Sequence, residues 1–257
     1  MRPTVSSPLR IREVQYGGAQ PLFCIPLVPA DLASLSEQAR IAVSLKPDLI
    51  EWRADFLRNQ TSEGLLECAS VLRRIAPHTA IIFTLRAKSE GGAQDIPSST
   101  RRLLIDSILR SKTIDIVDLE LANEPSFLAT LIPAAKSCGV RVLLAMHDFE
   151  QTPANEMLSG QIRAMRNLGA DIAKLAVMPR TEDDVLRLLD VTIRARREFP
   201  DLPLCTMAMG RLGSITRVGG FLFGSDMAFA VGKEASAPGQ IPIEDARQLT
   251  DLLLRYA

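Results

Sequence analysis

Two residues of this chain, Lys174 and His147, combine residue type and position in a way that suits covalent catalysis. Lys174 lies inside the apolar run 172–177, which is typical of a buried β-strand, and only six of the thirty basic residues are lysines. Burial disfavours the ammonium form, so a buried lysine is either paired with an acid or kept neutral for chemistry. His147 ends the preceding apolar run, 142–146. A buried amine and an acid–base imidazole on successive strands favour imine formation with a carbonyl substrate.

The same residues have a plainer interpretation. An isolated lysine in a strand often extends along apolar surface until its ammonium group reaches water. Charged side chains inside a barrel are also often structural ion pairs, because a buried charge needs a partner. Whether Lys174 is structural or catalytic therefore depends on which other residues lie near it.

Eight short apolar runs alternate with amphipathic stretches along the chain. The expected strands are Leu22–Val28, Leu49–Arg53, Ala80–Leu85, Ile116–Leu121, Val142–His147, Asp171–Val177, Leu204–Met209 and Ala228–Val231. The expected helices are Leu32–Leu45, Leu65–Ile75, Thr100–Leu109, Pro125–Ser137, Glu156–Leu168, Asp183–Phe199, Ser214–Phe223 and Glu244–Tyr256. Continuous apolar strands, each followed by a helix, are typical of a parallel sheet covered on its outer face. The pattern predicts an α/β fold, a (β/α)₈ TIM barrel forming one domain over residues 1–257.

Three further segments complete this expected architecture. Residues 10–19 carry Ile11 and Val14 ahead of two glycines, which suggests an N-terminal β-hairpin closing the bottom of the barrel. Residues 91–97 and 233–242 are rich in glycine and proline and are expected to be long loops. The active site of such a barrel lies at the carboxyl ends of its strands, beside loops of this kind.

The composition limits the possible partners. Thirty acidic residues balance thirty basic ones, and 47% of the 257 residues are hydrophobic. No basic block indicates nucleic-acid binding, and no run approaches the roughly 20 apolar residues of a membrane span. The first residues lack the apolar stretch of a signal peptide, so we expect a soluble, cytoplasmic protein with a small-molecule partner. The four cysteines are widely spaced and only two histidines are present, which argues against disulfides, a metal site or a metal cofactor.

Polar residues gather where the predicted strands end. Glu51 and Arg53 are two residues apart and therefore share one face of a strand. Arg86 directly follows the next strand. Further residues at these ends are Glu120, Met207 and Met209, and two loops, Glu90-Gly91-Gly92 and Ser236 to Gln240, could cover them. Together they describe a cavity for a polar, anionic ligand, although each charged pair alone could be structural.

Several motifs with polar or glycine residues follow one another along the chain. They are Glu51-Trp52-Arg53-Ala54-Asp55, Phe83-Thr84-Leu85-Arg86 with Glu90-Gly91-Gly92, His147-Asp148-Phe149 with Thr152-Pro153, Lys174-Leu175-Ala176-Val177-Met178-Pro179, Met207-Ala208-Met209-Gly210 and Ser236-Ala237-Pro238-Gly239-Gln240. Together they resemble one family, the type I 3-dehydroquinate dehydratases. Separated motifs in a fixed order are much harder to obtain by chance than one short pattern. The resemblance extends over essentially the whole chain and implies a commonly dimeric (β/α)₈ barrel without metal or organic cofactor.

The resemblance also implies a reaction, the dehydration of 3-dehydroquinate to 3-dehydroshikimate in the shikimate pathway of aromatic amino acid biosynthesis. Lys174 would form an imine with the C3 ketone, and His147 would remove the C2 proton and return it to the departing C1 hydroxyl. Glu90 would orient His147 and stabilise its charged form. Arg217 would hold the substrate carboxylate. The remaining ligand contacts implied by the family are Glu51, Arg53 and Arg86 to the hydroxyls, Met207, Met209 and Phe229 to the ring, and Ser236, Ala237 and Gln240 in a covering loop.

One position departs from the family pattern, and two other functions remain open. The family usually has a serine near the site on the first strand, where this chain has Cys24 or a neighbour. Another imine-forming barrel, such as an aldolase, would also need a strand lysine but not this set of Glu90, His147 and Arg217. A ligand-sensing module built on a dehydratase-like barrel could keep the fold without catalysis.

Overall fold

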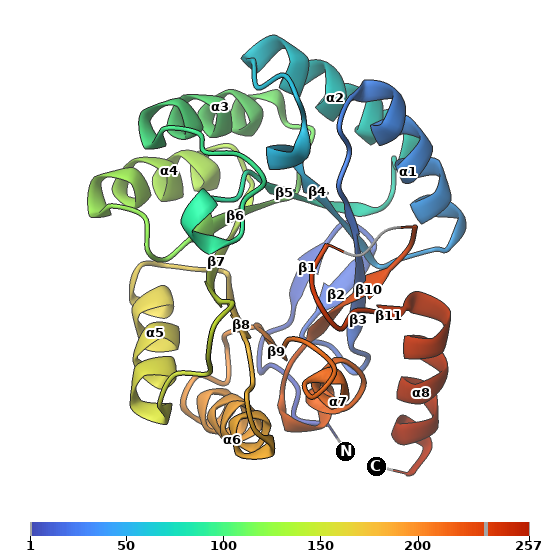
Figure 1. The fold of residues 1–257 in the computed structure, drawn as a ribbon, viewed down its shortest axis with the longest axis vertical. Helices are drawn as coiled ribbons and strands as arrows, with labels where there is room; N and C mark the ends of the chain where they lie inside the picture. Colours follow the sequence, from blue (N-terminus) through green and yellow to red (C-terminus); the bar gives the residue numbers. More distant parts are fainter. Residues whose placement is uncertain (1, 234–235, 257) are drawn as a thin grey trace.

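A ring of eight parallel strands surrounded by helices forms the molecule in the computed structural model, which describes residues 2–233 and 236–256 (Figure 1). The strands of the ring are β3 (Leu22–Leu27), β4 (Leu49–Arg53), β5 (Ala80–Thr84), β6 (Ile116–Glu120), β7 (Arg141–Asp148), β8 (Ile172–Val177), β9 (Leu204–Ala208) and β10 (Met227–Val231). The helices are α1 (Leu32–Ser44), α2 (Ser62–Ile75), α3 (Ser98–Ser111), α4 (Pro125–Ser137), α5 (Asn155–Asn167), α6 (Glu182–Glu198), α7 (Ser214–Gly219) and α8 (Ile243–Tyr256). The predicted (β/α)₈ barrel is thereby confirmed.

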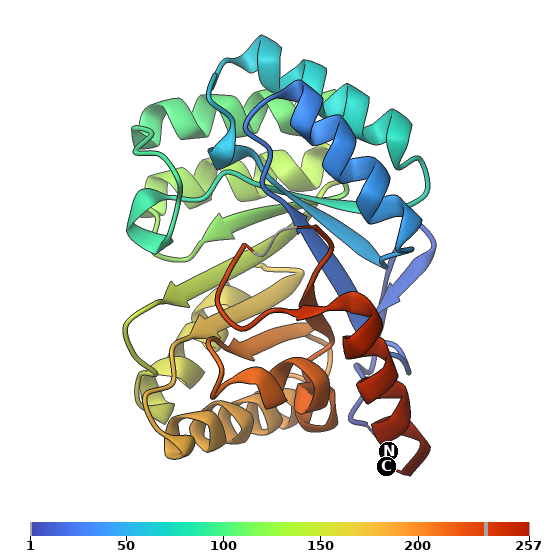
Figure 2. The same cartoon turned by 45° about the vertical axis from the view of Figure 1, so that its right-hand side comes forward.

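Neighbouring strands pair in parallel from β10 through β3 to β9. The ring closes between β9 and β10, where the Asp226 N–H donates to the Leu204 carbonyl at 2.7 Å. A short strand absent from the prediction, β11 (Ile241–Pro242), pairs with β10 at the end of the loop expected over residues 233–242. Residues 234 and 235 of that loop lie outside the described residues. Viewed from a second direction, the ends of the chain lie close together below the barrel (Figure 2).

Helix α2 begins three residues before its predicted start at Leu65. Thr61 caps this helix, because its hydroxyl accepts a hydrogen bond from the Gly64 N–H at 3.2 Å. The prediction began at the first apolar residue and overlooked the polar first turn. Near the chain end, the helix expected over 214–223 divides into α7 and a 3₁₀ turn, η3 (Gly220–Phe223). Two more 3₁₀ turns, η1 (Ala54–Phe56) and η2 (Lys88–Glu90), follow β4 and β5.

The N-terminal hairpin closes the amino-terminal mouth of the ring, as predicted. Strands β1 (Leu9–Ile11) and β2 (Val14–Tyr16) pair in antiparallel fashion. Ile11 and Tyr16 are buried in the same apolar cluster as the inward-facing residues of the barrel. The tight turn is made by Arg12 and Glu13, with Arg12 at a positive φ of 51°, so the glycine pair follows the second strand.

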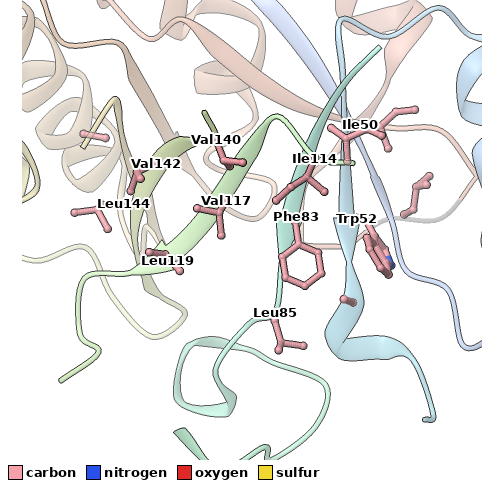
Figure 3. Packing of buried hydrophobic residues seen from close by; sticks show 14 of the residues in the cluster. Ile50, Trp52, Phe83, Leu85, Ile114, Val117, Leu119, Val140, Val142 and Leu144 are labelled. Carbon is pink, nitrogen blue, oxygen red and sulfur yellow. The ribbon is translucent and has the colours of Figure 1, made fainter. Parts of the chain in front are cut away.

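Two apolar clusters lie on opposite faces of the sheet. The outer cluster packs the strands against the helices, and Figure 3 shows part of it, with Trp52 and Phe83 in an edge-to-face contact at 5.1 Å between ring centroids. The inner cluster fills the ring below the charged residues. On β8, Ala173, Leu175 and Val177 belong to the outer cluster, so the alternation of side chains along a strand directs Lys174 inward.

A buried ion cluster lies at the bottom of the barrel. Asp226 is fully buried and accepts hydrogen bonds from the guanidinium groups of Arg2 and Arg196. It also accepts one from the Leu204 N–H at 2.8 Å.

Within the described part of the chain, no helix is both long and apolar enough to cross a membrane.

Candidate active site

The surroundings of Lys174 show whether this lysine is buried and paired or extends to water. Lys174 is 4% exposed, and its Nζ lies 3.0 Å from Asp118 Oδ2 and 3.7 Å from Glu51 Oε1. The Phe229 ring lies over the ammonium group, with 4.6 Å between Nζ and the ring centroid. Lys174 is therefore a paired, buried lysine, whose charge is balanced by two carboxylates and an aromatic face.

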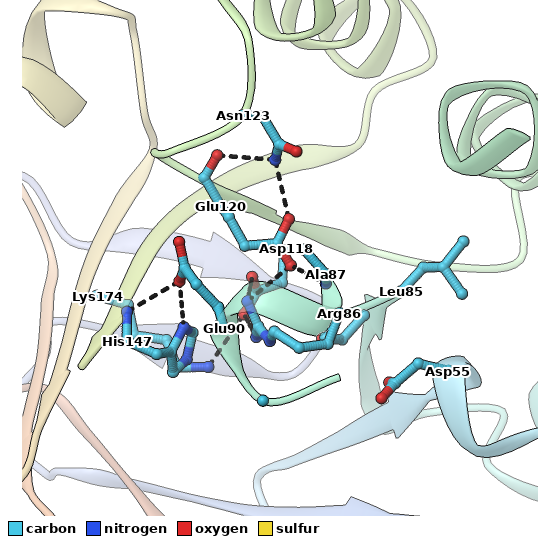
Figure 4. A network of polar contacts seen from close by, with 12 residues as sticks. Asp55, Leu85, Arg86, Ala87, Glu90, Asp118, Glu120, Asn123, His147 and Lys174 are labelled. Carbon is cyan, nitrogen blue, oxygen red and sulfur yellow. Dashed lines mark hydrogen bonds and ion pairs between the residues drawn. The ribbon is translucent and has the colours of Figure 1, made fainter. Parts of the chain in front are cut away.

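The carboxylate of Asp118 links Lys174 to Arg86. Arg86 donates to both oxygens of Asp118, at 3.0 and 2.8 Å, and to Glu120 at 3.1 Å (Figure 4). Burial alone would raise the pKa of Asp118, but Arg86 and Lys174 outweigh it and lower that pKa to about 2. Burial would likewise lower the pKa of Arg86, whereas Asp118 and Glu120 raise it above its ordinary value. Asp118 and Arg86 therefore both keep their charges at neutral pH.

Glu51 and Arg53 are held by neighbours on the same side of the ring. The Thr84 hydroxyl donates to Glu51 at 2.9 Å, which fixes the second carboxylate beside Lys174. Arg53 makes two 2.8 Å hydrogen bonds to Asp55 and a longer one to the Gly91 carbonyl. These contacts leave both residues at the cavity, but with part of their hydrogen-bonding capacity already used.

His147 and Glu90 form a pair at the carboxyl end of β7. Glu90 Oε2 lies 2.9 Å from His147 Nδ1 and also accepts the His147 backbone N–H at 2.9 Å. Burial lowers the pKa of His147 well below its ordinary value, with Arg86, Lys174 and Arg53 adding to the effect. Burial raises the pKa of Glu90 to about 7, although Arg86 opposes this rise. The imidazole is therefore neutral near pH 7, while the carboxyl group is close to half ionised.

Arg217 differs from the other cations of the site. It is 4% exposed, and no carboxylate among the described residues pairs with it. Its guanidinium donates to the carbonyls of Phe229, at 3.4 Å, and Pro238, at 2.9 Å, and its buried Nε has no partner. Burial lowers the pKa of Arg217 to about 10. A buried cation without an acid is a favourable place for an anion.

Residues 236–240, here called the strap, cover this side of the site. The Ser236 N–H donates to Gln240 Oε1 at 2.9 Å, and Gln240 Nε2 donates to the Ser236 hydroxyl at 3.2 Å. Gly239 has a positive φ of 76°, and a Cβ there would lie 2.3 Å from the Gly210 carbonyl oxygen. Only glycine fits this contact without displacement, so the strap is closely docked on the end of β9.

Thirteen residues to which the sequence and the resemblance gave a catalytic or ligand-binding role line one cavity of about 40 Å³ at the carboxyl ends of the strands. They are Glu51, Arg53, Arg86, Glu90, His147, Lys174, Met207, Met209, Arg217, Phe229, Ser236, Ala237 and Gln240. Glu120, which the sequence also placed at the cavity, does not line it, because its carboxylate pairs with Arg86 and Arg101 instead. The remaining lining residues, Phe149 and Ala176, were not singled out as ligand contacts. Asp118 was missed as well, although it lies two residues before Glu120 on the same strand face. Cys24 is fully buried in the inner apolar cluster, and the described lining of the cavity includes no residue of β3.

A buried lysine, a histidine–carboxylate pair and several arginines at the carboxyl ends of eight parallel strands define a (β/α)₈-barrel enzyme. The family model described as Type I 3-dehydroquinase matches residues 23–256. The chain belongs to this family and is an enzyme of the lyase class. The described residues contain no group of three histidine, cysteine or acidic side chains that could hold a metal ion.

Individual relatives are similar over almost their full length. A 3-dehydroquinate dehydratase of Geobacillus kaustophilus is 44% identical over 252 residues, 97% of this chain and 97% of the relative. The crystal structure of 3-dehydroquinate dehydratase from Geobacillus kaustophilus HTA426 matches with a TM-score of 0.95 and full coverage of both chains. The type I 3-dehydroquinate dehydratase of Clostridium difficile, solved with covalently modified comenic acid, is 31% identical, with a TM-score of 0.94, and covers 97% of this chain and 98% of its own.

Proposed function

We propose that this chain dehydrates 3-dehydroquinate to 3-dehydroshikimate in the shikimate pathway, through an imine on Lys174. The observation that carries the proposal is the juxtaposition of a buried lysine and a neutral histidine in one cavity, within the family just described. The covalently modified comenic acid of the Clostridium difficile relative supports covalent chemistry in this family. The aldolase alternative has no comparable support.

The carboxylates beside Lys174 suit the imine step because the charge at the nitrogen does not change. A lysine ammonium and a protonated imine each carry one positive charge, and forming one from the other and a ketone releases one water. Asp118 and Glu51 can therefore balance the charge at Nζ before and after the step without moving. The amine is uncharged only while it attacks, and charge balance of this kind lowers the reorganisation that the reaction requires.

The hydrogen bond between His147 and Glu90 selects the form of the imidazole that can act as a base. An ionised Glu90 only accepts hydrogen bonds, so His147 Nδ1 donates to Oε2 and Nε2 is left as the acceptor. Nε2 would remove the C2 proton and then protonate the departing C1 hydroxyl, which leaves as water. The low pKa of His147 favours prompt return of that proton. Hydrolysis of the imine then consumes one water and releases the product.

Arg217 would hold the substrate carboxylate. Its guanidinium lacks an acidic partner and has an unpartnered Nε, so an anionic group can pair with it without displacing another carboxylate. The present cavity of about 40 Å³ is much smaller than the roughly 300 Å³ or more of typical small-molecule sites. The strap would therefore open for substrate entry and close again through Pro238, whose carbonyl accepts from Arg217.

Two measurements test this function. Wild-type protein given 3-dehydroquinate should produce the ultraviolet absorption of the conjugated enone product, and borohydride added during turnover should leave a stable amine adduct on Lys174. Lys174→Ala should abolish both signals while circular dichroism shows a folded barrel. An adduct located on Lys88, an exposed lysine near the cavity rim, would contradict the assignment of the nucleophile.

Three expectations from the sequence remain proposals. We propose that the barrel forms a single domain over residues 1–257, that the enzyme works as a cytoplasmic homodimer, and that it neither uses a cofactor nor binds nucleic acid. Light scattering coupled to size-exclusion chromatography would test the dimer, since the chain mass is 28.1 kDa. A molar mass of one chain at micromolar concentration would contradict it.

A further inference from the structure

Arg101 is a buried arginine that lies outside the cavity but is connected to it. It belongs to the start of α3, is 4% exposed and is not part of the cavity lining. Its Nε and Nη2 both donate to the Leu85 carbonyl at 3.1 Å, and its Nη1 donates to Asn123 Oδ1 at 3.0 Å. Nη2 also donates to Glu120 Oε2 at 2.5 Å. Every nitrogen of this guanidinium is therefore engaged at the carboxyl ends of β5 and β6.

The contacts of Arg101 hold together the two ends of the segment 85–101, which carries Arg86 and Glu90. The chain leaves β5 at Leu85, runs along the rim of the cavity and reaches α3, where Arg101 extends back to the Leu85 carbonyl. A side chain that fixes the carbonyl of Leu85 also fixes the backbone from which Arg86 extends. Arg101 is thus placed to control the position of Arg86.

Buried side chains of alternating charge type lead from Arg101 to the lysine of the cavity. Glu120 accepts from Arg101 through Oε2 and from Arg86 through Oε1. Arg86 also donates to both oxygens of Asp118, and Asp118 Oδ2 lies 3.0 Å from Lys174 Nζ. Each of these five side chains belongs to a residue at most 4% exposed. Solvent screens interactions between such buried groups weakly, so a change of charge at one end is felt along the row.

We propose that Arg101 is a positioning residue for the proposed dehydration, which holds Glu120 so that Arg86 stays shared between Glu120 and Asp118. The inference rests on the proposed function. Without a cation at position 101, the salt bridge from Arg86 would be the one that remains to Glu120 among the described residues. Glu120 would then draw Arg86 away from Asp118, and one further negative charge near the cavity would be left without a partner.

The ionisation of Glu90 depends on the same balance of charges. Burial raises the pKa of Glu90 to about 7, Arg86 opposes this rise, and Glu120 adds to it. The charged or titratable groups that act on Glu90 are Arg86 after β5, Glu120 and Asp118 on β6, and His147 on β7. Loss of the cation that balances Glu120 would therefore raise the pKa of Glu90 further. Because ionised Glu90 selects the basic form of His147, the acidic limb of the kcat profile would move to higher pH.

Two substitutions of Arg101 separate its charge from its shape. Arg101→Gln should lower kcat at pH 7 by about five- to tenfold and move the acidic limb of the profile up by about one pH unit. KM should change little, because Arg101 does not line the cavity. Arg101→Lys should return the limb to its wild-type position, since an ammonium group again balances Glu120. It should restore only part of kcat, because it lacks the planar fork that reaches three partners at once.

Arg73→Gln is the matched control at the opposite end of β6. Arg73 joins α2 to Asp115, the residue before this strand, at 2.6 Å, and it also donates to three backbone carbonyls. Both glutamine variants should unfold at lower urea concentration than the wild type, because each loses a network of hydrogen bonds. Arg73→Gln should nevertheless keep the wild-type kcat and the wild-type acidic limb, which separates a loss of stability from a change in the charges near the cavity.

Asn123→Asp provides a second test that applies even where Arg101→Gln does not fold. Asn123 is partly exposed and contacts both Arg101 and Glu120, so the new carboxylate adds a negative charge at the same place while Arg101 remains. The acidic limb should again move to higher pH, by a smaller amount.

The proposal is overturned if Arg101→Gln or Asn123→Asp, once folded, keeps the acidic limb of the Arg73→Gln control. It is also overturned if Arg101→Lys moves the limb as far as Arg101→Gln, since the charge would then have no part in the effect. Failure of the proposed dehydration is recognised separately, because the wild-type protein would then form no enone from 3-dehydroquinate at any pH.

Discussion

The two mouths of the barrel both bury arginines and acids, yet they arrange them differently. At the bottom, the guanidinium groups of Arg2 and Arg196 converge on one carboxylate, Asp226, beneath the hairpin that carries the fully buried Tyr16. At the top, charged side chains surround a cavity, and Arg217 has no acid among the described residues. At the bottom, the buried charges therefore hold the barrel together. At the top, part of the buried charge has no protein partner and is left for a ligand.

The largest effect on activity is expected at the top of the barrel, when the imidazole of His147 is removed. His147→Ala should lower kcat by about 10²–10⁴-fold, the usual contribution of a general acid–base group. Borohydride trapping on Lys174 should remain detectable, because the amine and its carboxylates are intact. The product assay and mass spectrometry of the adduct measure the two steps separately. Wild-type turnover in this variant would assign the base to another group, with Glu51 the next candidate.

Removing the carboxylate of Asp226 at the bottom of the barrel should lower the stability of the fold and leave the catalytic rate unchanged. Asp226→Ala leaves two buried arginines without their carboxylate and should lower the free energy of unfolding by about 3–5 kcal/mol. Urea titration measures the loss, and kcat of the folded fraction should stay at the wild-type value. Asp201→Ala is the control, since its ion pair with Arg166 is largely exposed and should contribute about 1 kcal/mol or less. Equal effects of the two substitutions would contradict the role given to Asp226.

Glu90 allows a test in which stability and activity change in opposite directions. Its pKa is raised from 4.5 to about 7, so the folded state binds the proton more tightly, and stability is lost as pH rises through about 7. Glu90→Gln should therefore be more stable than the wild type at pH 8, by on the order of 2–3 kcal/mol, and lose this advantage at pH 4.5. Urea titrations at both pH values measure this, and kcat at pH 8 should fall. An equal stability difference at the two pH values would show that Glu90 does not titrate near 7.

The smallest effect is expected from a substitution of Arg217, the buried arginine at the top that has no acidic partner among the described residues. Arg217→Lys keeps the positive charge but loses the planar fork, so KM should rise about tenfold, or roughly 1.4 kcal/mol, with a smaller change in kcat. Initial rates over a range of substrate concentrations separate the two constants. An unchanged KM would place the substrate carboxylate at Arg53 or Arg86 instead.

The order of strands and helices could be predicted because each element carries its own periodicity. The inward direction of Lys174 also follows from alternation along one strand. Its ion pair with Asp118 could not be predicted, because that contact joins residues 56 positions apart and depends on the register of β6, β7 and β8. The stacking of Phe149 on His147 depends similarly on the path of a loop after its strand.

The bottom ion cluster was missed for a related reason. Arg2 lies in a segment with no periodic pattern, and Asp226 immediately precedes β10, where it resembles an ordinary loop residue. The docking of Gly239 on Gly210 was equally hidden, since glycine in a loop is common and its need for close approach appears only in three dimensions. Local pattern thus predicted many of the residues that face the cavity, the family resemblance added Arg217 and Phe229, and tertiary geometry supplied the partners of these residues.

The contact between Arg2 and Asp226 joins positions 224 residues apart and has a consequence for how the chain folds. Contacts of such long range form late, because the entropy of closing the intervening loop must be met before they contribute. Strand β10, which follows Asp226, completes the ring and supplies Phe229 to the lysine site. During synthesis on the ribosome, Arg2 therefore emerges long before its partner Asp226, and the cavity around Lys174 is complete only when the barrel closes.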